Sequence, residues 1–332
     1  PVVMITASHN PPEYNGVKLI GRDGIELSRD ALERIEDRLL SDRYETKPWN
    51  ETGESERVES ARRAYVDQLL AAVDRERIAD ADLTVALDPG HGAGALTSPD
   101  FFRELGCRVV TVNAQPDGHF PGRDPEPVAE NLEDLGALVR ATDADVGIAH
   151  DGDADRAIFY DEHGDYIEGD ATLAALAEAR LGAGDTAVSA VNVSQRLVDV
   201  TNRTGTDLEL TPIGSTYIIT RIRELQNEGE SVPVAGEGNG GILFPAYRLA
   251  RDGAYTAASF LELLADQTAS EAVADYGGYV NVRRNVEYDS DAEREALLAA
   301  VESYAEAADA EPTTTDGYRL DYGDAWVLAR PS

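Results

Sequence analysis

Three aspartates alternate with small residues directly after a short apolar segment of the chain. The apolar segment is 146–149, and the run at 151–156 reads Asp-Gly-Asp-Ala-Asp-Arg. Three carboxylates so close together repel one another, and a hard divalent cation, which prefers oxygen ligands, neutralises them. In a straight strand, side chains at i and i+2 stand about 6.6 Å apart, so the backbone has to curl around one ion, as Gly152 and Ala154 permit. The run predicts a strand that ends in a curled cation loop; the alternative is a solvated acidic turn.

The same run matches part of the loop of a helix–loop–helix calcium site. Acidic residues fill its first, third, fifth and twelfth positions, the last being Glu162. The sixth position should be glycine because the loop turns sharply there, but in this chain it is Arg156. The flanks 146–149 and 157–160 have the residue types of strands and not of amphipathic helices. We therefore expect a cation site at a strand end and not a calcium-sensor site.

A serine near the start of the chain lies in a loop stiffened by prolines. Residues 6–12 read Thr-Ala-Ser-His-Asn-Pro-Pro and lie between two strand-like segments. A serine oxygen is a useful nucleophile only with a base or a cation nearby, and His9 and Lys18 are the local candidates for Ser8. Only Lys18 and Lys47 are lysines in this chain, so a lysine beside the serine suggests a function for its ammonium group. The alternative is a structural turn with an incidental lysine.

Together these two segments resemble the α-D-phosphohexomutase family. Other segments that resemble family motifs follow in the family's order along the whole chain: 88–94, 120–127, 211–214, 236–241, 251–253 and 326–332. Several independent motifs in order are far more specific than any one of them.

The resemblance implies a catalytic site around Ser8, the position of the family's phosphoserine. It implies a magnesium site formed by Asp151, Asp153 and Asp155 with an oxygen of the Ser8 phosphate. Arg156 would brace the serine loop or its phosphate. Lys18 would move protons, and His9 would contact the phosphate or the loop.

The resemblance also implies a substrate site. Segment 236–241 resembles the sugar-binding loop, where Glu237 and Asn239 would bind hydroxyl groups. The remaining residues expected to bind substrate are Gly214, Arg330 and Ser332, the last two at the start of what resembles a phosphate-binding loop.

Two positions depart from the family pattern. Gly241 stands where bacterial members often have a histidine, and Thr216 stands where many have a lysine. Segment 236–241 also satisfies the Gly-x-Gly-x-x-Gly spacing of dinucleotide sites. Such a site needs a helix next, whereas 242–245 reads Ile-Leu-Phe-Pro and is too short for one.

The activity that the resemblance implies is an isomerase reaction. Phosphate would pass from Ser8 to a hexose phosphate and back, through a hexose 1,6-bisphosphate that also serves as activator, with Mg²⁺ as cofactor. The alternatives are a metal-dependent sugar phosphatase and a non-enzymatic sugar-phosphate sensor. The sequence does not distinguish mannose, glucose and glucosamine phosphates.

Composition excludes several partners. The chain has 29 basic and 63 acidic residues and a net charge of −34, which opposes nucleic acid and anionic membranes. No apolar run is long enough to span a bilayer, and the single cysteine fits the cytoplasm. Dispersed acid with arginine in place of lysine is typical of haloarchaeal proteins adapted to concentrated salt, where screening reduces self-repulsion. We expect a monomer or dimer.

Strand and helix patterns alternate along most of the chain, which predicts α/β domains with mostly parallel sheets. With the resemblance, this gives tandem mixed αβα domains followed by a partial α+β domain. The expected domains are 1–57, 58–160, 161–275 and 276–332, with the first and last incomplete because four whole domains are implied. Near the end, the pattern predicts a strand at 278–286 and a helix at 292–308.

Overall fold

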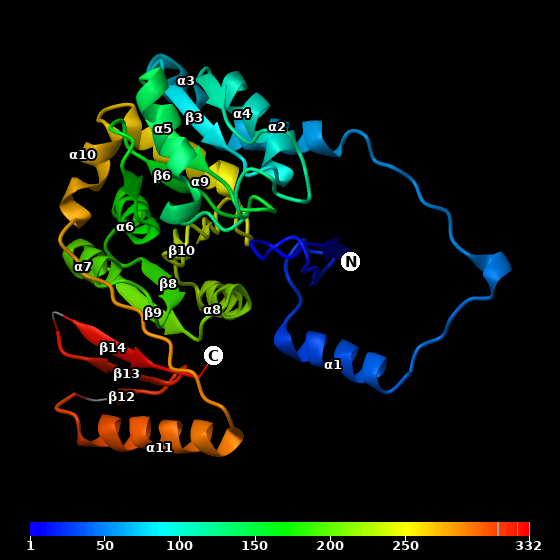
Figure 1. The fold of residues 1–332 in the computed structure, drawn as a ribbon, viewed down its shortest axis with the longest axis vertical. Helices are drawn as coiled ribbons and strands as arrows, with labels where there is room; N and C mark the ends of the chain where they lie inside the picture. Colours follow the sequence, from blue (N-terminus) through cyan, green and yellow to red (C-terminus); the bar gives the residue numbers. More distant parts are fainter. Residues whose placement is uncertain (311, 324, 332) are drawn as a thin grey trace. The chain divides into compact units, whose positions relative to one another are not determined.

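The computed structural model describes residues 1–310, 312–323 and 325–331. The chain forms two compact units, which we describe separately (Figure 1). The first unit contains Pro1–Tyr166 and Asp252–Ala269, and the second contains Ile167–Arg251 and Ser270–Ser332. The chain therefore passes between the units at three points, one of them between Arg251 and Asp252.

A five-stranded sheet is the centre of the first unit. Its order is β4-β3-β5-β6-β7, with β3, β4 and β5 parallel and β6 antiparallel to β5. The strands are β3 (Thr84–Asp88), β4 (Arg108–Thr111), β5 (Val146–Ala149), β6 (Ile158–Tyr160) and β7 (Tyr166–Ile167), the last ending at the first residue of the second unit. All of β5 is buried, as expected for a strand with helices on both faces.

The helices of this unit pack around that sheet. They are α2 (Ala61–Ala72), α3 (Arg75–Asp80), α4 (Ser98–Glu104), α5 (Glu133–Thr142) and α9 (Gly253–Leu264), with short 3₁₀ turns η2 (Ala93–Leu96) and η3 (Ala129–Asn131). A further turn, η1 (Trp49–Glu51), lies in an exposed segment and buries none of its residues. Helix α9 comes from the second segment of the unit, and its Phe260 ring lies 4.4 Å from that of Phe159 on β6.

The start of the chain is a hairpin followed by a helix. Strands β1 (Val2–Ile5) and β2 (Val17–Ile20) pair antiparallel, and α1 (Arg29–Leu40) follows. Every residue of β1 is exposed, and α1 buries none of its residues. The hairpin therefore contributes little apolar burial, and polar contacts at its loop connect it to the rest of the first unit.

The second unit contains two sheets. The four-stranded sheet has the order β11-β10-β8-β9, with β8 parallel to β9 and β10 and only β11 antiparallel. Its elements are β8 (Thr186–Ala190), β9 (Asp207–Thr211), β10 (Ala235–Gly236), β11 (Ile242–Leu243), α6 (Gly169–Arg180), α7 (Gln195–Thr204) and α8 (Ser215–Glu228), with α10 (Ala269–Val273) and η4 (Ala274–Tyr276) after α9.

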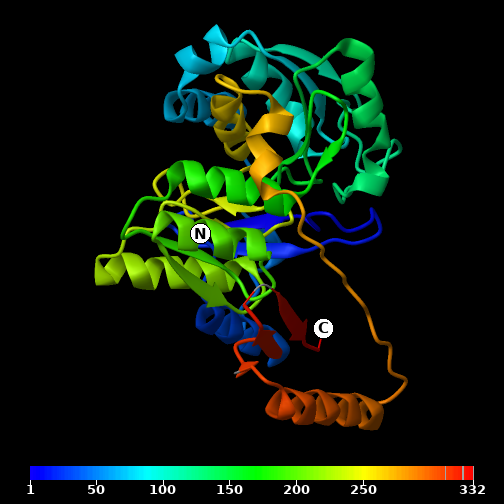
Figure 2. The same cartoon turned by 90° about the vertical axis from the view of Figure 1, so that its left-hand side faces the viewer.

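The last part of the second unit is antiparallel. Strands β12 (Pro312–Thr313), β13 (Tyr318–Asp321) and β14 (Trp326–Ala329) form one sheet, and α11 (Asp291–Ala307) lies along it in both views (Figure 2). Two mixed, mostly parallel αβα arrangements followed by an α+β one confirm the predicted fold class.

The strand predicted at 278–286 is wrong. The segment has no strand assignment, and Val280, Val282 and Val286 are 88%, 68% and 69% exposed. Its alternating residues resemble a strand, but a strand also needs a partner, and no described residue pairs with this segment. Across the described part of the chain, no helix has the length and apolar character required to cross a membrane.

Candidate active site

The three aspartates of the acidic run lie in a tight loop between β5 and β6. One oxygen from each of Asp151, Asp153 and Asp155 lies within 4.8 Å of the others. The loop curls because Ala154 has a φ of 60° and its N–H donates to the Asp151 carbonyl at 3.2 Å. The strand before it, the strand after it and the curl between them are as the sequence predicted. The flanking strands also exclude a helix–loop–helix calcium site.

This cluster is electrostatically unfavourable without a cation. Two like charges about 4.8 Å apart repel by about 3 kcal/mol at an effective dielectric constant near 20. Burial, with the charges of Asp155 and Asp153, raises the pKa of Asp151 to about 7. Asp153 Oδ1 is buried and accepts no hydrogen bond from the described residues. An oxygen-only donor set with such an atom fits a hard divalent cation.

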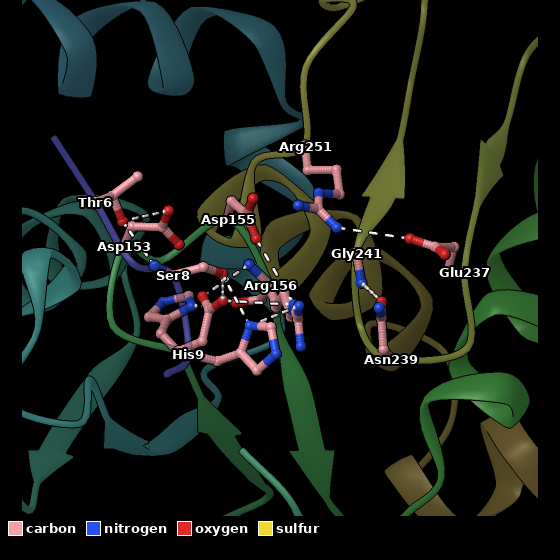
Figure 3. A network of polar contacts seen from close by, with 12 residues as sticks. Thr6, Ser8, His9, Asp153, Asp155, Arg156, Glu237, Asn239, Gly241 and Arg251 are labelled. Carbon is pink, nitrogen blue, oxygen red and sulfur yellow. Dashed lines mark hydrogen bonds and ion pairs between the residues drawn. The ribbon is translucent and has the colours of Figure 1, made fainter. Parts of the chain in front are cut away.

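Ser8 lies directly against this loop (Figure 3). Its hydroxyl oxygen is 3.3 Å from Asp151 Oδ2 and 3.1 Å from His9 Nδ1. The serine has a φ of 55°, an uncommon backbone conformation for a residue other than glycine. A Cβ at Gly152 would collide with the Ser8 carbonyl oxygen, so glycine at this position allows the two loops to approach.

Arg156 connects the histidine to the acidic loop. It donates to His9 Nδ1 at 2.9 Å, so this ring nitrogen is an acceptor, and its guanidinium lies 3.4 Å from Asp151 Oδ2. Burial, and then the charge of Arg156, lower the pKa of His9. The neutral ring and the Asp151 carboxylate are therefore two groups beside Ser8 that can accept a proton.

Lys18 lies against the carboxylates. Its Nζ is 3.9 Å from Asp153 Oδ2 and 3.6 Å from Asp155 Oδ2. Lys47 instead pairs with the exposed Glu51. The structure thus places one of the two lysines of the chain beside the acidic loop.

Sequence reasoning missed Thr6. The Ser8 backbone N–H donates to the Thr6 hydroxyl at 2.9 Å, and that hydroxyl donates to Asp153 Oδ2 at 2.9 Å. Thr6 therefore joins the serine loop to the acidic loop. A threonine two residues before Ser8 is a typical source of a local side chain–backbone bond, but its bond to Asp153 could not be foreseen.

A second polar cluster lies in the second unit, at the loop between β10 and β11. Glu237 is buried, and its Oε2 is 3.7 Å from Arg251 Nη1 (Figure 3). Asn239 is exposed, and its Oδ1 accepts from the Gly241 N–H at 3.0 Å. The chain therefore continues from β10 into β11 and not into a helix, which excludes the dinucleotide interpretation.

Arg251 explains the glycine at 241. A Cβ there would lie 2.6 Å from Arg251 Cδ, so a larger residue requires the arginine to move. Arg251 belongs to the segment 251–253 that resembles a family motif. Its position beside Glu237 makes it a further candidate for substrate contact.

Two of the remaining predicted substrate residues, Gly214 and Arg330, lie in the second unit near Asp316. The Ile213 N–H, next to Gly214, donates to Asp316 Oδ2 at 3.1 Å, and Arg330 donates to Asp316 Oδ1 at 3.3 Å. One carboxylate therefore joins the segment before α8 to the end of β14. Ser332 lies outside the described residues.

Comparisons with known proteins give the same family for successive parts of the chain. Family models for phosphoglucomutase/phosphomannomutase alpha/beta/alpha domains I, II and III match residues 1–46, 63–164 and 168–279. A phosphoglucomutase/phosphomannomutase of Thermococcus kodakarensis is 41% identical over 99% of this chain and 71% of its own length. A probable phosphoglucosamine mutase of Methanopyrus kandleri is 39% identical over 99% and 72%.

A solved structure of a protein from this family has a similar fold. A phosphoglucomutase/phosphomannomutase family protein from Burkholderia thailandensis superposes with a TM-score of 0.78 at 29% identity, covering 99% of this chain and 69% of that one. Fold and site thus define an isomerase of the intramolecular phosphotransferase class. The chain belongs to the phosphoglucomutase/phosphomannomutase family, the phosphohexomutases.

Proposed function

We propose that this protein is a Mg²⁺-dependent phosphohexomutase that interconverts hexose 1- and 6-phosphates through a phosphoserine at Ser8. The observation that carries the proposal is the 3.3 Å contact between Ser8 Oγ and Asp151, one of three carboxylates suited to one cation. A bound Mg²⁺ would neutralise charge on the phosphoryl oxygens during transfer. The three aspartates would hold it, together with an oxygen of the Ser8 phosphate.

The chemical step needs in-line placement and a route for one proton. The bond from phosphorus to Ser8 Oγ breaks, a bond to the sugar hydroxyl oxygen forms, and the proton of the sugar hydroxyl is passed on to Ser8 Oγ. We assign the proton exchange to Lys18, because it is the one lysine at the acidic loop. Arg156 would bind phosphate oxygens, since it already lies between Asp151 and His9.

In the reverse half-reaction, phosphate returns to Ser8 and its hydroxyl proton must leave. His9 lies 3.1 Å from that hydroxyl and can receive the proton, while Asp151 would stay a ligand of the cation. A hexose 1,6-bisphosphate would link the two half-reactions, and added bisphosphate would restore enzyme that has lost its phosphate.

We propose that the loop between β10 and β11 binds the sugar. Glu237 and Asn239 would accept hydrogen bonds from hydroxyl groups, and the nearby Arg251 adds a cation to an otherwise acidic protein. Arg330 and the backbone at Gly214 would contribute to binding of the non-reacting phosphate, because anions favour arginine and free N–H groups. The buried Cys107 fits a protein of the reducing cytoplasm.

The named relatives set the substrates to test. Mannose 1-phosphate, glucose 1-phosphate and glucosamine 1-phosphate should be assayed in parallel, each with Mg²⁺ and its 1,6-bisphosphate. Conversion of at least one to the 6-phosphate supports the proposal. Release of inorganic phosphate without isomer would instead indicate a phosphatase. Sugar-phosphate binding with no phosphate acquired at Ser8 would indicate a sensor.

A further inference from the structure

The backbone of the acidic loop is held from outside at regular intervals. The carbonyl oxygens of four alternate residues, 150, 152, 154 and 156, each accept a hydrogen bond from a donor outside 151–156. The aspartates occupy the positions between them. Alternation of this kind leaves the aspartate side chains available for a ligand while other groups fix the main chain.

Two of these donors are backbone N–H groups. Ala93, at the start of η2, donates to the Gly152 carbonyl at 2.9 Å. Gly253, at the start of α9, donates to the Ala154 carbonyl at 3.1 Å. Both lie in the first unit, so the loop is attached to two separate parts of its own domain.

The third donor is a buried arginine. Arg123 donates to the His150 carbonyl at 2.6 Å, and its own charge is paired with the fully buried Asp88 at 2.9 Å. Asp88 also accepts from the Gly90 N–H at 2.7 Å and from Asn113 at 3.1 Å. The ion pair is therefore buried and held by further hydrogen bonds, and it fixes the position at which the acidic loop begins.

The fourth donor is the side chain of His150. Its Nδ1 lies 2.8 Å from the Arg156 carbonyl, and its Nε2 lies 3.0 Å from the Ser98 hydroxyl on α4. A carbonyl only accepts, so Nδ1 carries the proton and Nε2 accepts from Ser98. The ring thus joins the residue before Asp151 to the last residue of the acidic run.

We propose that His150 is a positioning residue that closes the acidic loop and holds its three carboxylates ready for the cation. This inference rests on the proposed cation site at Asp151, Asp153 and Asp155. Without the bond to Arg156, one end of the loop is released, and like charges drive the aspartates apart. The cation then has to reorder the loop when it binds, which weakens its affinity.

Three substitutions of His150 distinguish loss of its hydrogen bond to the Arg156 carbonyl from a change in side-chain volume. His150→Phe keeps a ring and removes both nitrogens. His150→Asn places an amide nitrogen where Nδ1 was, within reach of the Arg156 carbonyl. His150→Gln places its amide where Nε2 was, toward Ser98, and does not restore the bond. Val139→Ala, in the core at α5, is the control for general destabilisation.

The measurement is the dissociation constant of Mg²⁺ by calorimetric titration, with the melting temperature of each metal-free variant. We expect the constant to rise about 10- to 100-fold for His150→Phe and His150→Gln, as for other residues that orient metal ligands, and to stay near wild type for His150→Asn. Val139→Ala should lower the melting temperature without weakening Mg²⁺ binding.

Two results would overturn this inference and leave the proposed cation site standing. One is a wild-type Mg²⁺ affinity in His150→Phe, and the other is a Mg²⁺ affinity in His150→Asn as weak as that in His150→Gln. If His150→Phe does not fold, the difference in Mg²⁺ affinity between His150→Asn and His150→Gln tests the inference. A wild-type protein that takes up no Mg²⁺ would overturn the proposed cation site itself and this inference with it.

Discussion

The acidic loop and the serine loop meet at one site, but they are held in different ways. The acidic loop follows a fully buried strand, and its backbone is fixed by donors from other elements of the unit. The serine loop belongs to a hairpin whose first strand is exposed throughout. Its polar contacts outside the hairpin run to the acidic loop itself, through Thr6, Ser8 and His9.

This difference indicates that the position of one loop depends on the other. The acidic loop takes its shape from the core of the domain, and the serine loop takes its position from the acidic loop. Substitutions in the serine loop should therefore affect the reaction with little effect on stability or, apart from the phosphate oxygen at Ser8, on cation binding. Substitutions in the acidic loop should affect cation binding first.

The largest effect is expected for Ser8→Ala. Turnover should fall at least about a thousandfold, as when other enzymes lose a nucleophile, while the melting temperature stays close to wild type and the Mg²⁺ affinity stays close to that of dephosphorylated wild type. Mass spectrometry should show one phosphate on the wild type and none on the variant. The exposed Ser28, which makes no side-chain cap bond, provides the control Ser28→Ala. Near-normal turnover in Ser8→Ala would end the phosphoserine mechanism.

A smaller loss is expected for Lys18→Gln, with two parameters moving in opposite directions. Turnover should fall about a hundredfold if the lysine exchanges the proton. Mg²⁺ should bind more tightly, because the competing ammonium beside Asp153 and Asp155 is gone. Lys47→Gln, which removes only an exposed pair with Glu51, should change neither value. Weaker Mg²⁺ binding in Lys18→Gln would show that the lysine supports the acidic loop.

Removing the Thr6 hydroxyl tests which loop depends on the other. Thr6→Val takes an acceptor from the Ser8 N–H and a donor from Asp153, and Thr6→Ser keeps both. Each lost hydrogen bond is worth about 1 kcal/mol and two are lost, so turnover should fall about fivefold to thirtyfold in the valine variant alone. Mg²⁺ affinity measured by titration should barely change. A large loss of affinity would mean that the serine loop also shapes the acidic loop.

The two loops also differ in how far the sequence could predict them. The curl after β5 follows from local features: an apolar strand, alternating acids and small residues between them. The same holds for α11, whose predicted range of 292–308 differs from the observed Asp291–Ala307 by one residue at each end, because its helical spacing is contained in its own residues. The bond between Thr6 and Asp153 joins residues 147 positions apart, and no local pattern records it.

Elements that depend on tertiary context were missed or wrong for the same reason. Helix α9 was not predicted, because most of its residues are buried and it lacks the polar face that gives a helical period. Segment 278–286 has a strand period but no partner in the described structure. The role inferred for His150 is also not local, because Ser98 on α4 completes it.

The smallest effects are expected from solvent conditions, and they separate surface charge from the buried loop. The net charge of −34 is dispersed, so raising KCl to molar concentration should screen it and raise the melting temperature by several degrees. The acidic loop is mostly shielded from this screening by burial and should respond to Mg²⁺. Asp153→Asn should therefore retain the KCl shift of the wild type and lose most of the Mg²⁺ shift, since it removes one of three ligand charges. Thermal midpoints of both proteins in KCl and Mg²⁺ series provide the test. A flat KCl profile would exclude salt adaptation as the cause of the acidic composition, and an intact Mg²⁺ shift in Asp153→Asn would place the cation away from this loop.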